Sequence, residues 1–355
     1  MLACSRAAAT RHLASLPNSE APIDAYNAQC SSRNRCSSPS NARRRQNVGA
    51  PLVVAHCSRG CPLAKVFWTE AGRMLVQDRY RSMLSSWPTR HDQLRIPTCQ
   101  GETFVLACGS ESAPPLVLFH GGMTTSVMWS RSAAAWSAYF RVFAVDLIGE
   151  PGFSAPSRPS MTSDGHARWL DDVWNALRIE SASIVGASLG GWLALDYAIR
   201  RTAKVSRLAL LAPAGVGRVR LRFLLKAGPL LLMGPWGHRR ALNLDMGFDP
   251  SERTGAEGNA FVSFLKLAQQ HYVARTRPIP MFTDQGIRRV TIPVMAIVGG
   301  KDAIFDSNHT KRRLEGCLPQ VQIKYLSEAG HGLVDSTSSV LEFLLAATEM
   351  RRASG

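Results

Sequence analysis

The chain has 355 residues, 45% of them hydrophobic, which is enough for one large domain or two small ones with a sizeable core. Its formal net charge of +16 is uneven, because residues 1–66 contain nine Lys and Arg but only two Asp and Glu. Elsewhere the arginines are scattered and no zinc-finger, helix-turn-helix or aromatic RNA-binding pattern stands out, so we expect no nucleic-acid partner.

Five of the eight cysteines also lie within the first 66 residues. A chain of this length does not need disulfides to stabilise its core, which favours free thiols in a reducing compartment and predicts a cytoplasmic protein. Cys57 and Cys61 have no nearby Cys or His pair to complete a zinc site, so no metal is expected.

Residues 1–62 are rich in Ser, Arg, Asn and Ala and have few periodic apolar positions, which predicts a tail separate from a domain at 63–355. Three interpretations stay open: a disordered tail, an organelle-targeting segment, or an upstream extension from a wrongly chosen start codon. No clean secretory signal is present. The most apolar stretch, 221–236, is interrupted by Lys226 and two Gly-Pro pairs, so we expect no stable membrane insertion.

From about Phe67 the apolar residues follow helical spacing as far as Trp87, which predicts a helix or a pair of helices ended by Pro88. An antiparallel pair of strands is expected next, at 94–98 and 103–109. Apolar strands and helices then alternate. We expect strands at 114–122, 141–149, 182–188, 205–215, 291–300 and 321–329, and helices at 128–140, 163–179 (with Ser163 as N-cap), 189–201 and 338–352.

This alternation predicts an α/β fold, in which a mostly parallel, doubly wound sheet is covered by helices on both faces. The alternation stops between Gly215 and Gly286, where helical patterns are interrupted by Pro and Gly. We therefore expect a helical cap at about 215–285, inserted after a strand.

Residues 184–193, IVGASLGGWL, place Ser188 at the junction of an expected strand and an expected helix. A nucleophilic serine must stand clear of the sheet on a sharp, strained turn, where bulky side chains two positions away would clash. Gly186 and Gly190 satisfy that requirement. The turn also aims the backbone N–H of Leu189 at a developing oxyanion. The motif in this context predicts that Ser188 is a nucleophile rather than part of a glycine-rich turn.

The second oxyanion donor should come from the loop after an earlier strand, where His120-Gly121-Gly122-Met123 follows PLVLF. We predict the Gly122 N–H in this role, with Met123 as the alternative. His120 is interpreted as holding the loop by hydrogen bonds rather than as a base.

The base and the acid of a triad should follow later strands. His331 lies between Gly330 and Gly332 in a short loop before the last helix, and it is the predicted base. Asp302 follows the strand VMAIVGG and is the predicted acid, which would hold the imidazole tautomer and stabilise the imidazolium. Asp306 is the alternative acid.

The order Ser188, Asp302, His331 and the segments PLVLFHGG, AVDLIGEPGFSAP, VGASLGG, IVGGKD and GHG resemble the α/β-hydrolase superfamily, over about four-fifths of the chain. The chain is most similar to cap-bearing bacterial hydrolases of the carboxylesterase type. The resemblance implies a structural role for Asp146, in the turn after its strand. Residues 1–62 match nothing in the pattern.

The implied reaction is acyl transfer from a small to medium apolar ester through an acyl-enzyme, without a metal or cofactor. The candidate substrate-binding residues are Met123, in the loop after PLVLF, and Phe223 and Trp236, in the cap region. That region carries many apolar side chains, although these could equally pack the cap onto the sheet. Two alternatives stay open: a C–C bond hydrolase, lactonase or peptidase with the same triad, and a slow-turnover ligand-binding protein on this fold. The oligomeric state is not predicted.

Overall fold

The computed structural model describes residues 64–234, 236–237, 240, 256–275, 277–332 and 336–353. All of them belong to the second of two units into which the chain divides, His56–Gly355. The expected tail at 1–62, with Cys57, Cys61 and the three earlier cysteines, lies outside the described residues. The three cysteines within them, Cys99, Cys108 and Cys317, are free thiols, as expected.

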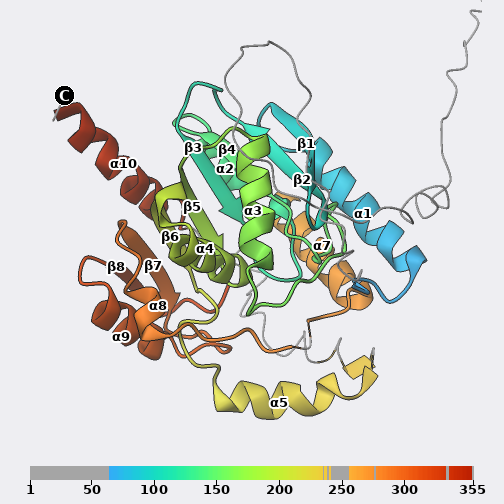
Figure 1. The fold of residues 1–355 in the computed structure, drawn as a ribbon. Coiled ribbons are helices and arrows are strands. Elements are labelled where there is room, and N and C mark those ends of the chain that lie inside the picture. The colour runs from blue at the N-terminus through green and yellow to red at the C-terminus, as the bar shows by residue number, and fades with distance from the viewer. Residues whose placement is uncertain are drawn as a thin grey trace, which may run out of the picture. The chain divides into compact units, whose positions relative to one another are not determined.

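Eight strands form one sheet in the order β1-β2-β4-β3-β5-β6-β7-β8 (Figure 1). Strands β1 and β2 are antiparallel to each other, as are β2 and β4, and every other pair of neighbouring strands is parallel. The expected α/β sheet is therefore confirmed. The strands are β1 His91–Thr98, β2 Gly101–Cys108, β3 Pro115–Phe119, β4 Arg141–Val145, β5 Ala182–Ala187, β6 Val205–Leu211, β7 Val294–Gly299 and β8 Gln322–Leu326.

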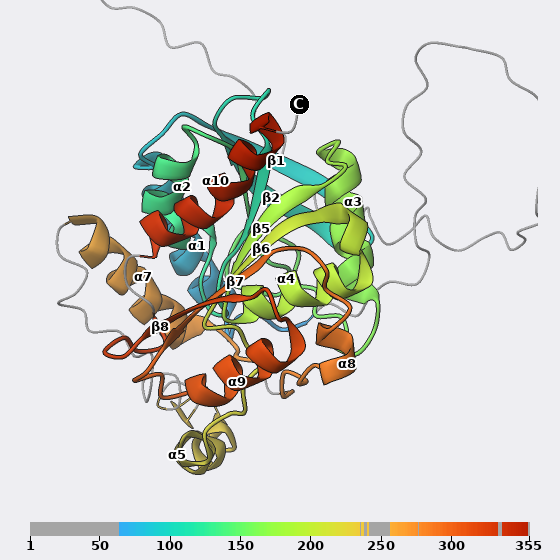
Figure 2. The ribbon, with the colours of Figure 1, turned by 90° about the vertical axis from the view of Figure 1, so that its left-hand side faces the viewer.

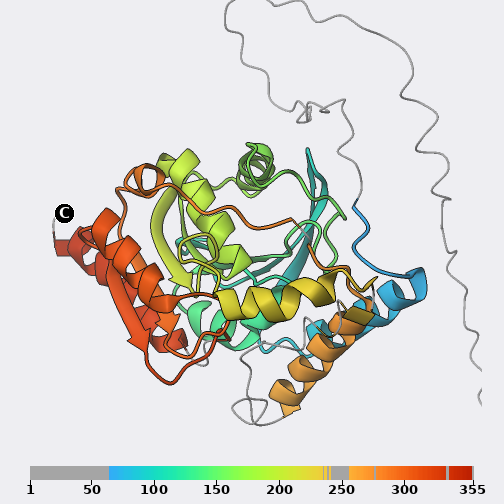
Figure 3. The same ribbon diagram turned by 90° about the horizontal axis from the view of Figure 1, so that it is seen from below.

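Helices cover both faces of the sheet (Figure 2). One face carries α1 Glu70–Ser85, α2 Ser130–Trp136, α7 Ala256–His271 and α10 Thr337–Ala353. The other carries α3 Gly165–Ala176, α4 Leu189–Arg200, α8 Asp284–Ile287 and α9 Ser307–Cys317. Two short 3-10 turns lie at Ser126–Trp129 and Thr202–Lys204. Helix α5, Leu221–Leu231, stands below the sheet in Figure 1 and in front of it in Figure 3.

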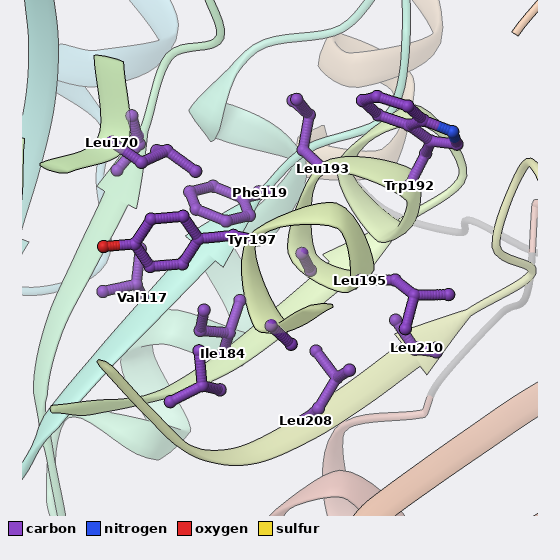
Figure 4. Close-up of a cluster of buried hydrophobic side chains, with 14 of the residues drawn as sticks. Val117, Phe119, Leu170, Ile184, Trp192, Leu193, Leu195, Tyr197, Leu208 and Leu210 are labelled. Atoms are coloured by element: carbon purple, nitrogen blue, oxygen red, sulfur yellow. The ribbon is translucent and has the colours of Figure 1, made fainter. Parts of the chain in front are cut away.

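Alternate side chains of the buried strands fill two separate cores, because successive residues of a strand point to opposite faces. In β3, Val117 and Phe119 join the cluster under α3 and α4, which Figure 4 shows, while Leu116 and Leu118 join the cluster under α1, α2 and α10. Every residue of β5 is buried. A strand enclosed on both faces explains why the sequence shows a continuous apolar run there.

The structure refines two expectations about helices and adds a helix that was not predicted. The first apolar stretch forms one helix, α1, whose N-cap Thr69 accepts a hydrogen bond from the Gly72 N–H at 3.0 Å. Helix α3 begins one residue later than predicted, with Asp164 at the N-cap position. Ser163 Oγ accepts from the Gly165 N–H at 3.2 Å. Helix α9 was not predicted, because its sequence SNHTKRRLEGC is mostly polar and buries only four residues.

The region between β6 and β7 contains α5, α7 and α8 among its described residues. Phe261 and Phe264 on α7 are buried in the core cluster that includes α1. Leu221, Leu224 and Leu225 on α5 are instead between 49% and 69% exposed. Across the described residues, no helix is both long enough and apolar enough to cross a membrane.

Candidate active site

Ser188 stands between the end of β5 and the start of α4, with φ 50° and ψ −111°. A Cβ on Gly186 would lie 2.4 Å from the Gly190 carbonyl oxygen, and a Cβ on Gly190 would lie 2.2 Å from the Phe119 carbonyl oxygen. Both distances are below any ordinary contact, so only glycine fits at either position. The small residues of the motif therefore allow a turn that leaves the Ser188 side chain partly exposed at the edge of the sheet.

The loops after β7 and β8 bring an acid and a base to this serine. The Oγ of Ser188 lies 3.0 Å from Nε2 of His331, and Nδ1 of His331 lies 2.8 Å from Oδ2 of Asp302. In the sequence, Ser188 lies 143 positions before His331, and Asp302 lies 29 positions before it. Since a carboxylate only accepts, Nδ1 carries the proton and Nε2 is left free to accept from the serine hydroxyl.

Asp302 is fully enclosed, with 1% of its side chain exposed. Burial raises the pKa of this carboxyl, but the hydrogen bond and charge of His331, together with the N–H groups of Phe305 and Ile304, outweigh it and hold the pKa below its ordinary value. Those N–H groups donate to Oδ1 at 2.9 and 2.8 Å. The alternative acid, Asp306, is instead the N-cap of α9 and accepts from the His309 N–H at 3.0 Å.

The loop after β3 passes directly over the serine turn. A Cβ built on Gly121 would lie 3.8 Å from the Ser188 Cβ, and one built on Gly122 would lie 3.7 Å from the Leu189 side chain. Within the described part of the chain, the N–H groups of Gly122 and Leu189 have no hydrogen-bond acceptor. Two unpaired donors beside one hydroxyl are suited to bind a negatively charged oxygen.

His120 holds this loop through its ring, as the sequence suggests. Its Nδ1 donates to the Gly121 carbonyl at 2.7 Å, and its Nε2 accepts from the Leu147 N–H at 2.9 Å. Complete burial lowers the pKa of His120, so the ring is neutral and can donate through one nitrogen and accept through the other. Thr124 Oγ1 also donates to the Gly121 carbonyl, at 2.9 Å.

Asp146 organises the turn after β4. Its Oδ1 accepts from Tyr80 of α1 at 2.8 Å and from the Ser126 hydroxyl at 2.7 Å, and its Oδ2 accepts from the Phe153 N–H at 2.9 Å. The carboxylate is fully buried and does not contact the Ser188 group through any described hydrogen bond. This is the structural role that the sequence resemblance implies.

The predicted substrate-binding residues are dispersed. Met123 is 6% exposed, follows Gly122 in the loop after β3, and has a positive φ of 64°. Its N–H donates to Glu150 Oε2 at 2.7 Å, which removes it as the alternative oxyanion donor. Phe223 lies on α5 and is partly exposed, and Trp236, just beyond α5, is 53% exposed. No described hydrogen bond or ring contact joins either of them to Ser188, His331 or Asp302.

Sequence reasoning missed several residues around the site. The ring of Phe305 meets the ring of His331 edge-on, with centroids 5.3 Å apart. Glu150, in the turn after β4, is buried beside the loop that carries Gly122 and pairs with Arg275 at 2.8 Å. In the sequence, Glu150 is only a charged residue in a Gly- and Pro-rich turn. Charged residues are usually exposed to solvent, so nothing marked this one as buried.

A sequence model described as the alpha/beta hydrolase fold matches residues 114–238, which include the Gly122 loop and the Ser188 turn. An uncharacterized carboxylesterase of Bacillus subtilis, nap, is 32% identical over 261 residues, which cover 72% of this chain and 85% of that protein. The chain belongs to the α/β-hydrolase family.

Among solved structures, this α/β hydrolase resembles naproxen esterase from Bacillus subtilis with a TM-score of 0.66 and 28% identity, over 79% of this chain and 99% of the other. A 2-hydroxymuconate semialdehyde hydrolase from Pseudomonas sp. (strain CF600) is 37% identical over 243 residues, covering 61% of this chain and 80% of that protein. The family thus confirms the fold expected from sequence, and the relatives make this chain a carboxylesterase-like hydrolase.

Proposed function

We propose that this α/β hydrolase cleaves carboxylic esters through an acyl-enzyme formed on Ser188. The observation that carries the proposal is the hydrogen-bonded chain from Ser188 Oγ through His331 to Asp302, at 3.0 and 2.8 Å. A serine hydroxyl is a weak nucleophile at its ordinary pKa and needs an adjacent base. In the hydrogen-bonded chain, Nε2 of His331 accepts from the Ser188 hydroxyl, and Nδ1 is held by the Asp302 carboxylate.

In the first half of the reaction, His331 Nε2 takes the hydroxyl proton while Ser188 Oγ attacks the ester carbonyl carbon. The carbonyl oxygen becomes an oxyanion and accepts hydrogen bonds from the Leu189 and Gly122 N–H groups. Asp302 stays ionised throughout and stabilises the imidazolium. The imidazolium then donates its proton to the alcohol oxygen, which leaves.

In the second half, a water molecule enters the position of the alcohol. His331 takes a proton from this water as its oxygen attacks the acyl carbon. The imidazolium then donates this proton to Ser188 Oγ as the bond from Oγ to the acyl carbon breaks and the carboxylic acid departs. Every proton moves between Ser188, His331, the substrate and water, so the cycle closes without another reactant.

The preferred substrate is a small to medium apolar ester. We assign the described residues between 215 and 285 to a cap over the site, with Phe223, Trp236 and Met123 as candidate contacts for the acyl or alcohol group. Exposed leucines on α5 and a backbone bridge between Val219 and Phe305, beside His331, support this placement. The buried phenylalanines of α7 do not belong to the pocket, because they pack against α1.

Hydrolysis of a carbon–carbon bond is the second candidate, since one relative at 37% identity is named for a semialdehyde rather than an ester. The same Ser188, His331 and Asp302 would serve that reaction. The values of kcat/KM for p-nitrophenyl butyrate and for 2-hydroxymuconate semialdehyde separate the two, because ester hydrolysis predicts the larger value for the butyrate and carbon–carbon hydrolysis predicts it for the semialdehyde.

The decisive test is the turnover of p-nitrophenyl esters of graded acyl length by the wild type, Ser188→Ala and His331→Ala. Each variant should lose on the order of 10³-fold or more in kcat while its circular dichroism stays native. The acyl length with the largest kcat/KM indicates the size of the pocket that binds the acyl group. Near-normal turnover by either variant would refute the triad, and a ligand-binding role would gain if Ser188→Ala kept its biological activity.

A further inference from the structure

The loop that carries Gly122 is held from two sides. The peptide that joins Gly121 to Gly122 has its carbonyl held by His120 Nδ1 at 2.7 Å and by Thr124 Oγ1 at 2.9 Å. In a trans peptide the carbonyl and the N–H point in opposite directions, so these bonds aim the Gly122 N–H away from His120. The next peptide contributes the Met123 N–H, which donates to Glu150 Oε2 at 2.7 Å.

Glu150 therefore anchors the second of the two peptides that flank Gly122. This matters because Met123 has a φ of 64°, a region that few residues other than glycine adopt. Met123 keeps this conformation only while the surrounding structure holds it. The hydrogen bond from its N–H to a buried carboxylate is a charge-assisted one, which is stronger than a neutral bond.

Glu150 is in turn held by two residues of the segment that follows α7, Tyr272 and Arg275. The Tyr272 hydroxyl donates to Oε2 at 2.8 Å, and Arg275 Nε donates to Oε1 at 2.8 Å. The Glu150 side chain is 0% exposed and the Arg275 side chain 17%. Arg275 also donates to the Ile148 carbonyl at 3.0 Å, so its guanidinium spans the turn after β4.

The charge of this group matters as much as its geometry. Burial raises the pKa of Glu150, but Arg275, Arg158 and the Met123 N–H outweigh it, so the pKa is lowered and the group is an anion. An anion beside the Gly122 loop would oppose the negative charge that develops on a carbonyl oxygen there. Arg275 neutralises it locally.

We propose that Glu150 is a positioning residue for the oxyanion hole, and that Tyr272 and Arg275 extend this machinery into the segment that follows α7. The proposal rests on the function proposed above, because it assigns these residues to the Gly122 donor. Glu150 touches no substrate and acts through the Met123 peptide. The segment between β6 and β7 therefore influences the Gly122 donor through the Glu150 carboxylate, in addition to any contact that it makes with substrate.

The test compares Glu150→Gln, Arg275→Met, Tyr272→Phe and the double variant Glu150→Gln/Arg275→Met with wild type on p-nitrophenyl butyrate. A misaimed donor weakens the transition state more than the ground state, so kcat should fall at least about tenfold in the first two while KM changes less than about threefold. Tyr272→Phe should show a smaller fall in kcat. The double variant should recover part of the loss of Arg275→Met, because it removes the uncompensated anion.

A second readout uses a trifluoromethyl ketone, whose hemiketal oxygen occupies the same position as the oxyanion. Its inhibition constant should rise in each variant by about the factor by which kcat falls. Asp196→Asn is the matched control: this carboxylate on α4 is also buried and paired, with Arg200 at 2.8 Å, but it does not contact the Gly122 loop. It should leave kcat and the inhibition constant unchanged.

Ser188→Ala separates the two proposals. If Ser188→Ala is inactive while Glu150→Gln and Tyr272→Phe keep the wild-type kcat and inhibitor affinity, the positioning role is wrong and the triad stands. If Ser188→Ala stays active, the proposed function itself fails. A fall in kcat matched by an equal change in Asp196→Asn would show general destabilisation and would also overturn the positioning role.

Discussion

At the scale of single residues, two neighbouring aspartates have different tasks. Asp302 accepts from His331 and from two backbone N–H groups, whereas Asp306 caps α9. Four positions separate them, and the sequence alone offers either as the acid of the triad. The structure distinguishes them through the turn at Asp302–Phe305, which directs the first side chain toward His331 and the second toward the helix.

We predict that Asp302→Asn lowers kcat by roughly 10³- to 10⁴-fold, because an amide at this position favours the wrong imidazole tautomer. The measurement is kcat for p-nitrophenyl butyrate at neutral pH. Asp306→Asn is the control and should keep at least about half of the wild-type kcat, since Asn caps helices as well as Asp does. An equal loss in both variants would contradict the assignment of Asp302.

The proposed triad could be predicted from the sequence because each member follows a strand of the parallel part of the sheet, and the carboxyl ends of these strands lie at one edge. Glu150 and Arg275 could not be read in this way. They lie 125 positions apart, and neither has a motif that marks it as buried. Their pairing depends on how the segment after α7 packs against the turn after β4, which no local pattern encodes.

At the scale of elements, the approach of β5, α4 and β3 determines the site. Helix α4 can start immediately after Ser188 only because Gly190 lets the β3 strand end lie against it. The strand–turn–helix context was predictable, since both flanking elements have strong apolar patterns. Helix α9 was not, because it has only four buried positions, which lie among charged residues: Ser307, Thr310, Leu314 and Cys317.

We predict that Gly190→Ala destabilises the fold by about 1–3 kcal/mol or prevents folding, because its Cβ would meet two backbone oxygens at 2.2 and 2.5 Å. Gly316→Ala in α9 is the control. Its Cβ would meet nothing within 4 Å, so it should raise stability by about 0.4–1 kcal/mol. Urea unfolding of both variants measures the difference. Equal stabilities would contradict the tight packing inferred at Gly190.

At the scale of the whole molecule, every hydrogen bond described for the site lies between residues of the unit His56–Gly355. The composition of residues 1–62, rich in Ser, Arg, Asn and Ala with few periodic apolar positions, predicts a boundary near residue 62. What the sequence could not supply is which parts of the inserted region between β6 and β7 pack as core. Apolar residues of α5 and α7 look alike in sequence but differ in burial.

We predict that a chain starting at residue 63 keeps kcat/KM for p-nitrophenyl butyrate within about twofold of the full chain. The site and both core clusters are then complete, since the first described core residue is Val66. The full chain assayed in parallel is the control. A loss of tenfold or more with a native circular dichroism spectrum would show that the first 62 residues contribute to catalysis.

The backbone at Ser188, with φ 50° and ψ −111°, has an evolutionary consequence. A side chain in this region costs on the order of 1–3 kcal/mol, a cost that glycine largely avoids. Selection for thermal resistance alone would therefore favour a glycine there, together with the loss of the proposed nucleophile. A serine at this position keeps the proposed chemistry at the expense of a more stable fold, so stabilising substitutions are better sought at positions far from this turn.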